Sequence, residues 1–304
     1  MPSENKRAIE ELLASINEAN LRQHLRELVG VRHPAANPRG LRKAAEYLAE
    51  RMRSFGLEVR EDAIDALPSE HVNVIGTVSG PNDRQPILLV GAHYDATEDS
   101  PGADDNASGL AVLLELARTV SAGNGKLVLQ FVGFALEEPG FLGSEHYARR
   151  IGGTGQTLAG AIILECVGFT DSREGSQSAP PGLPLSLPKR GNFIGVVANG
   201  PAKWMKEAFE DAAKRYVPEL PVVSLLIPGR GENLPDTRRS DHVPFWDRGL
   251  PGMFLTDTAN FRNPHYHRPT DVSETLDLPF MLATARALAA AVAEMAGGPG
   301  KPAR

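Results

Sequence analysis

Hydrophobic positions follow two different periods along the chain. A helical period marks two opening stretches, about Lys6–Val29 and Arg39–Ser54. In the second stretch Leu41, Ala44 and Leu48 are three and four residues apart, which places them on one helix face. The same period predicts further helices at Ser108–Val120, Gly143–Arg150, Ala202–Tyr216 and Leu278–Met295.

Short apolar runs between the helices predict strands. They lie at Glu58–Glu61, Val72–Val78, Ile87–Gly91, Lys126–Phe134, Gly160–Leu164, Phe193–Val197, Pro221–Leu226 and Gly252–Leu255. Strands that alternate with helices are typical of one α/β domain around a largely parallel sheet. The short early strands are expected to add an antiparallel edge. The stretch 172–191 is rich in Ser, Pro and Gly, and we expect it to be a surface loop.

Composition narrows the class of protein and of partner. A chain of 304 residues can bury a large core, and its net charge of −6 gives no electrostatic reason to expect nucleic acid or an anionic membrane as partner. Cys166 is the only cysteine, which excludes an intrachain disulfide and fits a reducing compartment. Met1–Asn20 carries charges throughout, unlike a signal peptide. We therefore expect a cytoplasmic protein, or an exported one whose leader has been removed.

Neither a membrane span nor an oligomeric state is predicted by any pattern. The Ala-rich end near Ala283–Ala296 is interrupted by Arg286 and Glu294, so no stretch is expected to cross a bilayer.

Candidate metal ligands collect where the predicted strands end. They are His93 and Asp95, Asp104 and Asp105, Glu137 and Glu138, Glu165, Asp241 and His242, and the group His265, Tyr266, His267 and Asp271. Any one of them alone is more often a helix cap or a turn residue. Ligands bind outside the carboxyl ends of strands in such sheets, and imidazole and carboxylate groups bind divalent metals. Their joint pattern therefore predicts a metal site.

Six motifs occur in an order that resembles the M28 family of zinc peptidases, over roughly Asn73 to Asp277. They are His93-Tyr94-Asp95, Pro101 to Gly109, Leu136 to Ser144, Leu164-Glu165, Ser240 to Phe245 and Tyr266 to Asp271. The resemblance implies a single catalytic domain over residues 1–304, folded as a three-layer αβα sandwich with a mixed, mostly parallel sheet. The helices of residues 1–55 would pack on that domain. It also implies two zinc ions, with Mn²⁺ or Co²⁺ as possible substitutes.

The resemblance assigns five ligands residue by residue. His93 and Glu165 resemble ligands of the first zinc, and Glu138 and His267 resemble ligands of the second. Asp105 matches the carboxylate that bridges both ions, as a site with two close metals requires.

Four further residues take supporting or catalytic roles in the same resemblance. Glu137 matches the general base, which accepts the proton of the attacking water. Asp95 matches a carboxylate behind the histidine ligand, and Asp241 is expected to support the site or line the pocket. Tyr266 either donates a hydrogen bond to the substrate carbonyl or only packs there.

The function that follows is a zinc-dependent exopeptidase, with an aminopeptidase favoured. Its substrate would be a peptide with a free N-terminus, attacked by a hydroxide that the two metals share. A carboxypeptidase is the alternative if Arg230, Arg238 and Arg239 converge on the site. A glutaminyl cyclase uses the same fold with one zinc, and a metal-free binding module would require the loss of ligands. The sequence leaves the side-chain preference open.

Overall fold

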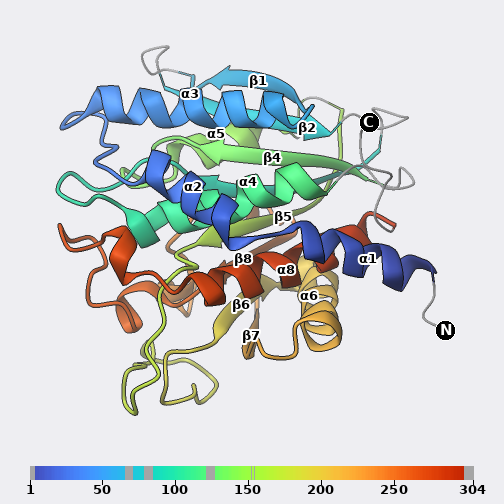
Figure 1. Ribbon diagram of the computed structural model, residues 1–304, viewed down its shortest axis with the longest axis vertical. Helices are drawn as coiled ribbons and strands as arrows, with labels where there is room; N and C mark the ends of the chain where they lie inside the picture. The colour runs from blue at the N-terminus through green and yellow to red at the C-terminus, as the bar shows by residue number, and fades with distance from the viewer. Residues whose placement is uncertain are drawn as a thin grey trace.

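Eight strands form one mixed sheet in the order β1-β2-β4-β3-β5-β8-β6-β7. The computed structural model describes residues 4–65, 71–78, 85–120, 127–151, 153 and 155–297 (Figure 1). The strands are β1 (Glu58–Ala63), β2 (Val72–Val78), β3 (Ile87–His93), β4 (Val128–Phe134), β5 (Leu158–Glu165), β6 (Ile194–Asn199), β7 (Val222–Ile227) and β8 (Gly252–Thr256).

The strand directions confirm a mixed and mostly parallel sheet. The four central strands β4, β3, β5 and β8 are parallel neighbours. The early strands β1 and β2 add the expected antiparallel edge. At the other edge β6 pairs antiparallel with β8, and β7 then pairs parallel with β6. The amino ends of β6 and β7 therefore lie beside the carboxyl ends of the central strands.

Helices cover both faces of the sheet. The helices are α1 (Glu4–Ser15), α2 (Glu18–Leu28), α3 (Pro38–Ser54), α4 (Gly109–Thr119), α5 (Leu142–Ile151), α6 (Lys203–Tyr216), α7 (Val243–Asp247) and α8 (Leu278–Met295). The larger apolar core contains residues of α1 to α4, α6 and α8, whereas the smaller core on the opposite face contains residues of α5 and α7. This arrangement gives three layers, and Figure 1 shows most of the helices in front of the sheet.

Apolar runs become the central strands because both faces of those strands are covered. Every residue of β3 and of β4 is buried. Strands buried on both faces are expected to be continuously apolar instead of alternating. The uninterrupted run Ile87-Leu88-Leu89-Val90 therefore marks the centre of the sheet.

The first predicted helix is wrong as a single element, because two helices occupy it. Asn17 caps α2, and its side chain accepts a hydrogen bond from the Asn20 backbone N–H at 3.0 Å. The backbone N–H of Asn17 in turn donates to the buried Glu115 carboxylate on α4 at 3.1 Å. These hydrogen bonds, made by cap chemistry and not by hydrophobic spacing, end one helix and begin the next. The short helix α7 was also not predicted. The predicted strand Lys126–Phe134 corresponds to β4, which begins at Val128; Lys126 itself lies outside the described residues.

Two other expectations concern the surface loop at 172–191 and the apolar C-terminal helix α8. No helix or strand forms between the paired residues Asp171 and Gly191, so the expected loop is confirmed. The expectation that no stretch could span a bilayer needs correction, because α8 is long and apolar enough by length and composition. However, 67% of α8 is buried against the rest of the protein, as in the core helix of a globular fold.

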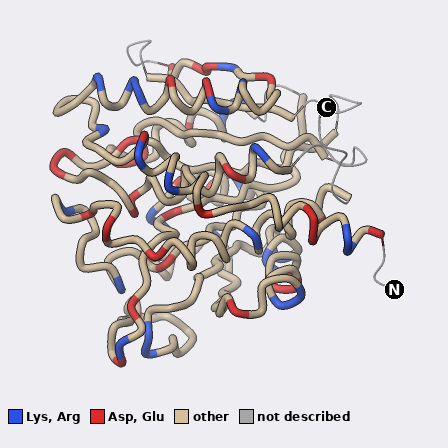
Figure 2. Tube along the Cα trace, in the orientation of Figure 1, with Lys and Arg blue, Asp and Glu red and all other residues tan. Residues whose placement is uncertain are grey.

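Charge is distributed along the whole chain. Figure 2 shows acidic and basic residues interspersed on the helices and loops. The carboxyl ends of the four central strands lie side by side: His93 pairs with Phe134, and Glu165 pairs with Thr256. The candidate ligands follow these strand ends.

Candidate metal centre

His93 is the last residue of β3 and lies at the centre of a buried polar cluster. Its side chain is 0% exposed, and its Nε2 atom lies 3.2 Å from Oδ1 of Asp105 and 3.3 Å from Oε2 of Glu165. The three side chains can present one ligand atom each to a single ion. His93 and Glu165 end the paired strands β3 and β5, so the sheet sets their spacing, whereas Asp105 comes from the helical segment Ala103–Ser108 before α4.

Asp105 also belongs to a second group of ligand atoms. Its other oxygen, Oδ2, lies 3.0 Å from Nε2 of His267, and that nitrogen lies 3.4 Å from Oε2 of Glu138. Asp105, Glu138 and His267 can again present one ligand atom each to one ion. The two groups share only Asp105, whose oxygens face different histidines.

The donor set fits metal ions better than it fits a hydrogen-bonded network. Nε2 of His93, Oδ1 of Asp105 and Oε1 of Glu138 are buried and have no hydrogen-bond partner in the described parts of the chain. Buried polar atoms without a partner are costly, and they are rare unless an ion or water satisfies them. Nitrogen and carboxylate oxygen are also the ligands of a catalytic zinc site.

Backbone donors hold the loop that carries Asp105. The Asp271 carboxylate accepts hydrogen bonds from the backbone N–H groups of Asp104 at 2.9 Å and Asp105 at 3.2 Å. The Asp104 carboxylate faces away from the ligands, where it accepts from the backbone of Gly168 and the side chain of Asn263. Asp104 thus connects this segment to the chain after β5 and to the stretch before His265.

Asp95 connects the first histidine to the loop that carries both glutamates. Its carboxylate accepts from the backbone N–H of Glu137 at 3.0 Å and of Glu138 at 3.1 Å. Nδ1 of His93 lies 3.2 Å from the backbone carbonyl oxygen of Asp95 and 3.5 Å from its Oδ1 atom. A backbone carbonyl or a carboxylate behind a ligating histidine fixes the orientation of the ring. Asp95 occupies such a position.

Glu137 lies outside the two groups that share Asp105, but it forms a third group of possible ligands with His93 and Glu138. Its side chain is 9% exposed, and Oε2 is 4.0 Å from Nε2 of His93. Burial raises the pKa of Glu137 well above its usual range; His93 opposes this shift and Glu165 adds to it. A carboxyl whose pKa is raised in this way accepts a proton more readily than an exposed glutamate.

Burial and mutual repulsion shift the pKa values of the carboxyl groups in the cluster. Burial, reinforced by the charge of Asp105, raises the pKa of Glu138 to about 9. Burial also acts to raise the pKa of Asp105, but His267 and His93 outweigh it and hold this pKa well below its usual range. Buried like charges cannot all ionise without a nearby countercharge. Divalent cations would supply that charge.

Asp241 and Tyr266 lie at the same cluster, whereas His242 packs on Phe254 and His265 pairs with the Thr270 hydroxyl. Asp241 is fully buried, and burial raises its pKa to about 7. The adjacent Ser240 hydroxyl donates to Oε2 of Glu165 at 2.7 Å. The Tyr266 ring stacks on His267, with 3.9 Å between centroids, and burial raises the pKa of its phenol, which stays a hydrogen-bond donor.

Sequence reasoning missed one residue that supports this centre. Arg32, 2% exposed, donates to the backbone carbonyls of Tyr94 at 2.8 Å, Pro101 at 2.9 Å and Gly102 at 2.9 Å. It thereby connects the segment before α3 to the loop between His93 and Asp105. A single arginine between two helical patterns carries no signal of such a role, because its acceptors are backbone atoms.

Strained backbone accompanies the ligands. Leu136, Cys166 and His267 have positive φ values of 58°, 50° and 57°. Leu136 precedes Glu137, Cys166 follows Glu165, and His267 is itself a candidate ligand. Residues other than glycine rarely adopt this left-handed conformation, and such strain collects at functional sites.

Comparison with known proteins identifies the family. The sequence profile of peptidase family M28 matches residues 73–292. The chain belongs to peptidase family M28. This M28 chain is therefore a hydrolytic enzyme that acts on peptides.

Relatives of the M28 chain include bacterial proteins of similar sequence. The uncharacterized protein YfbL of Escherichia coli is 34% identical, over 84% of this chain and 82% of its own length. Aminopeptidase YwaD of Bacillus subtilis is 30% identical, over 66% of this chain and 40% of its own length.

Solved structures share the fold of the M28 chain. The LapA aminopeptidase of Legionella pneumophila has a TM-score of 0.76 at 18% identity, with 97% of this chain and 76% of that chain covered. The aminopeptidase of Aneurinibacillus sp. strain AM-1 has a TM-score of 0.73 at 17% identity, over 97% and 98%. These likenesses confirm the αβα fold of the M28 chain.

Proposed function

We propose that this enzyme is a zinc-dependent aminopeptidase that holds two metal ions. The observation that carries the proposal is the orientation of Asp105, whose two oxygens lie 3.2 Å from His93 and 3.0 Å from His267. Glu165 completes the first group and Glu138 the second. Zinc bound there would polarise the peptide carbonyl and lower the pKa of the attacking water.

Glu137 performs the proton transfer in this proposal. It accepts a proton from the water as the water oxygen attacks the peptide carbonyl carbon. It then passes the proton to the peptide nitrogen as the carbon–nitrogen bond breaks. The raised pKa of Glu137 suits this return of the proton. Tyr266 stacks on His267, and in this proposal its phenol donates a hydrogen bond to the substrate carbonyl oxygen.

The charge around the centre favours the amino end of a peptide. The ligand Glu165 and its neighbour Glu137 are each 7% exposed and would attract a free α-ammonium group. Names of relatives such as aminopeptidase YwaD support this direction. The carboxypeptidase alternative requires converging arginines, but of the three considered only Arg239 lines the cavity beside Glu165. Arg238 instead pairs with Asp247 at 2.8 Å.

Glu137→Gln tests the proposal. We expect the variant to keep its zinc, measured by elemental analysis, and to hydrolyse Leu-p-nitroanilide about 10²- to 10⁴-fold more slowly. The matched control is Glu98→Gln, which changes an exposed residue between His93 and Asp105. Wild-type turnover by a zinc-loaded Glu137→Gln enzyme would exclude Glu137 as the base.

Acetylation of the substrate tests the direction of attack. The acetylated compound lacks the ammonium group, and we expect the wild-type enzyme to leave it uncut. Equal cleavage of the free and acetylated compounds would exclude an aminopeptidase. Removal of metal by a chelator should abolish both the bound zinc and the activity, and added zinc should restore them.

A further inference from the structure

The two edge strands of the sheet differ in charge. The strand order places β1 at one edge and β7 at the other, and Figure 1 shows them at opposite ends of the sheet. β1 has the sequence EVREDA, in which four of six residues are charged, whereas β7 has the sequence VVSLLI and carries no charge. Charged side chains are one means of keeping an open edge from pairing with another chain. β1 has this protection and β7 lacks it.

The open edge of β7 presents a row of backbone hydrogen-bonding groups. The Ile194 N–H donates to the Pro221 carbonyl at 2.9 Å, and this bond sets which residues of β7 face β6. Alternate residues of a strand direct their N–H and C=O groups to opposite sides. The odd-numbered residues of β7 therefore bond to β6, whereas Val222, Ser224 and Leu226 direct their backbone groups to the open edge. Within the described residues, β6 is the only strand that pairs with β7.

Other devices that block an open edge are also missing from β7. Its pairing with β6 runs in a continuous register, without a bulge, and prolines lie only outside the strand, at Pro221 and Pro228. The Leu226 side chain on this strand is 38% exposed. Edges that are regular, apolar and uncharged are templates for the addition of a further strand.

Both faces of β7 contact the rest of the protein, which leaves the edge as the open side. On one face, the Ser224 hydroxyl donates to the Glu210 carboxylate of α6. Lys206 of α6 pairs with the same carboxylate at 2.9 Å, so this contact carries no net charge.

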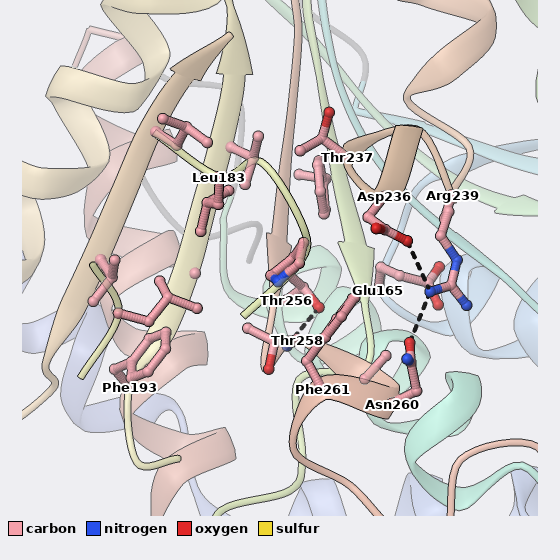
Figure 3. A pocket seen from close by; sticks show the side chains of 18 of the residues that line it. Glu165, Leu183, Phe193, Asp236, Thr237, Arg239, Thr256, Thr258, Asn260 and Phe261 are labelled. Atoms are coloured by element: carbon pink, nitrogen blue, oxygen red, sulfur yellow. Dashed lines mark hydrogen bonds and ion pairs between the residues drawn. The ribbon is translucent and has the colours of Figure 1, made fainter. Parts of the chain in front are cut away.

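On the other face, β7 forms part of the floor of an apolar cavity. Val223 and Leu225 line this cavity of about 100 Å³, which adjoins Glu165. Figure 3 shows Leu183 and Phe193 on its apolar side. The strand is thus held in place from both faces, and a second strand could pair with it without displacing either contact.

β7 is complementary to a second copy of itself. In an antiparallel pair with a twofold axis at Ser224, Val222 of each copy lies opposite Leu226 of the other. All three outward residues then meet outward residues, as an antiparallel ladder requires. Opposed apolar side chains stabilise a strand pair, and the uncharged strand places no like charges opposite each other.

The charges beside the strand match in the same arrangement. Exposed Glu219 lies three residues before β7, and exposed Arg230 lies three residues after it. The nearby Glu232 carboxylate already accepts the Arg230 backbone N–H at 2.9 Å. Antiparallel pairing brings the Glu219 end of each copy to the Arg230 end of the other, so opposite charges approach each other twice.

We propose that the open edge of β7 is a homodimer interface, at which two copies of this chain join their sheets by antiparallel pairing of β7. The inference does not depend on the aminopeptidase function. Twofold pairing uses the β7 edge of both copies and leaves the charged β1 edges outside, so assembly stops at the dimer. A strand of six residues is shorter than the contact of a stable complex, about 20–30 residues a side, so the dimer should separate on dilution.

Leu226→Lys tests the edge, with Trp204→Lys as its matched control. Both side chains are 38% exposed, but Trp204 lies on α6 and not on the edge strand. Sedimentation velocity from about 5 to 500 µM should show wild type and Trp204→Lys approaching twice the monomer mass. Leu226→Lys should remain monomeric, because pairing would bury its charge against Val222 of the other copy. A wild type that stays monomeric throughout, or an equal loss of dimer in both variants, would overturn the proposal.

Ser224→Cys tests the register of the pair. At the twofold axis the two copies of residue 224 lie opposite each other, with about 5.5 Å between their Cα atoms, which a disulfide can span. In the matched control Leu226→Cys, the two new cysteines would be about 13 Å apart along the strands. The native Cys166 is fully buried and should not take part.

Oxidised glutathione should convert Ser224→Cys to a covalent dimer on a non-reducing gel, and Leu226→Cys at least about tenfold more slowly. Cross-linking of both variants at the same rate would mean random collision of the copies and would overturn the paired register. Faster cross-linking of Leu226→Cys than of Ser224→Cys would overturn it as well.

Discussion

The metal centre and the apolar cavity meet at Glu165 but are built by different means. At the centre, side chains are held by hydrogen bonds to the backbone, such as those from Glu137 and Glu138 to Asp95. In the cavity, apolar side chains form the surface through packing alone. The first kind of construction fixes atoms for chemistry, whereas the second can change in shape without disturbing them.

This contrast predicts where substitutions act. Changes at the centre should alter metal content and rate for every substrate, whereas changes in the cavity should alter the ranking of substrates. The following variants test that separation.

Asp105→Asn should have the largest effect. Asp105 belongs to both ligand groups, and an amide in its place removes a negative charge and one ligand oxygen. Loss of a supporting residue costs about 10- to 100-fold, so loss of a shared ligand should exceed about 100-fold in activity. Elemental analysis should show less than the wild-type zinc content, with the ranking of substrates unchanged. The exposed Asp99 in the same loop provides the control Asp99→Asn. Wild-type zinc content in Asp105→Asn would contradict its place between the groups.

Arg32→Met should chiefly reduce stability. The substitution leaves several buried carbonyls without a donor, among them those of Tyr94 and Pro101. Each unsatisfied group costs about 1–3 kcal/mol, and we expect a loss of about 3 kcal/mol in the free energy of unfolding, measured by urea denaturation. The exposed Arg26 on α2 gives the control Arg26→Met, which should lie within about 0.5 kcal/mol of wild type. A small effect in Arg32→Met would show that water replaces the guanidinium.

Much of the fold could be predicted from the sequence because burial leaves a direct pattern. The apolar run at Ile87 marks a strand covered on both faces, and it led to His93 at the strand end. The reversed direction of β6 could not be predicted, since strand patterns carry no direction. The break at Asn17 depends on Glu115, which is far away in the chain.

The candidate ligands could be predicted because they lie at or after strand ends in motifs that resemble a family, and the structure brings all five together. The sequence could not predict which residues support the loop that carries Asp105, nor which residues line the cavity beside Glu165. Arg32 acts through backbone carbonyls, which every residue has. Leu183, Leu185 and Leu187 lie in a segment without helix or strand, so their place in one cavity with residues of β6 and β7 becomes visible only in three dimensions.

Acid should lower the stability of the protein through protonation of His242, which lies on the cavity side. This histidine is fully buried, stacks on Phe254 with 4.1 Å between centroids, and has its Nε2 2.8 Å from the Thr237 carbonyl oxygen. Burial lowers its pKa from 6.5 to about 3. Between these values the unfolded chain binds the proton and the folded chain does not, so stability falls as the pH falls.

We expect His242 to contribute a loss of about 2 kcal/mol between pH 6.5 and pH 5. Urea denaturation at both pH values measures the loss, and His242→Asn should reduce the pH dependence by that amount. A pH dependence unchanged in His242→Asn would mean that the imidazole is not buried in its neutral form. The variant also tests the comparison between the metal centre and the cavity, because His242 contacts the cavity residues Thr237 and Phe254.

Arg239→Gln should have the smallest effect, and it separates the two directions of attack. The side chain is 41% exposed and its ion pair with Asp236 spans 3.8 Å, so its contribution should stay below about 1 kcal/mol, or about fivefold in kcat/KM. For an aminopeptidase the loss should be equal for Leu-p-nitroanilide and for the dipeptide Leu-Gly, because neither places a carboxylate at Arg239. A loss above tenfold confined to the dipeptide would mean that Arg239 binds the substrate carboxylate. That outcome would revive the carboxypeptidase alternative and make the polar side of the cavity, not its apolar floor, the source of selectivity.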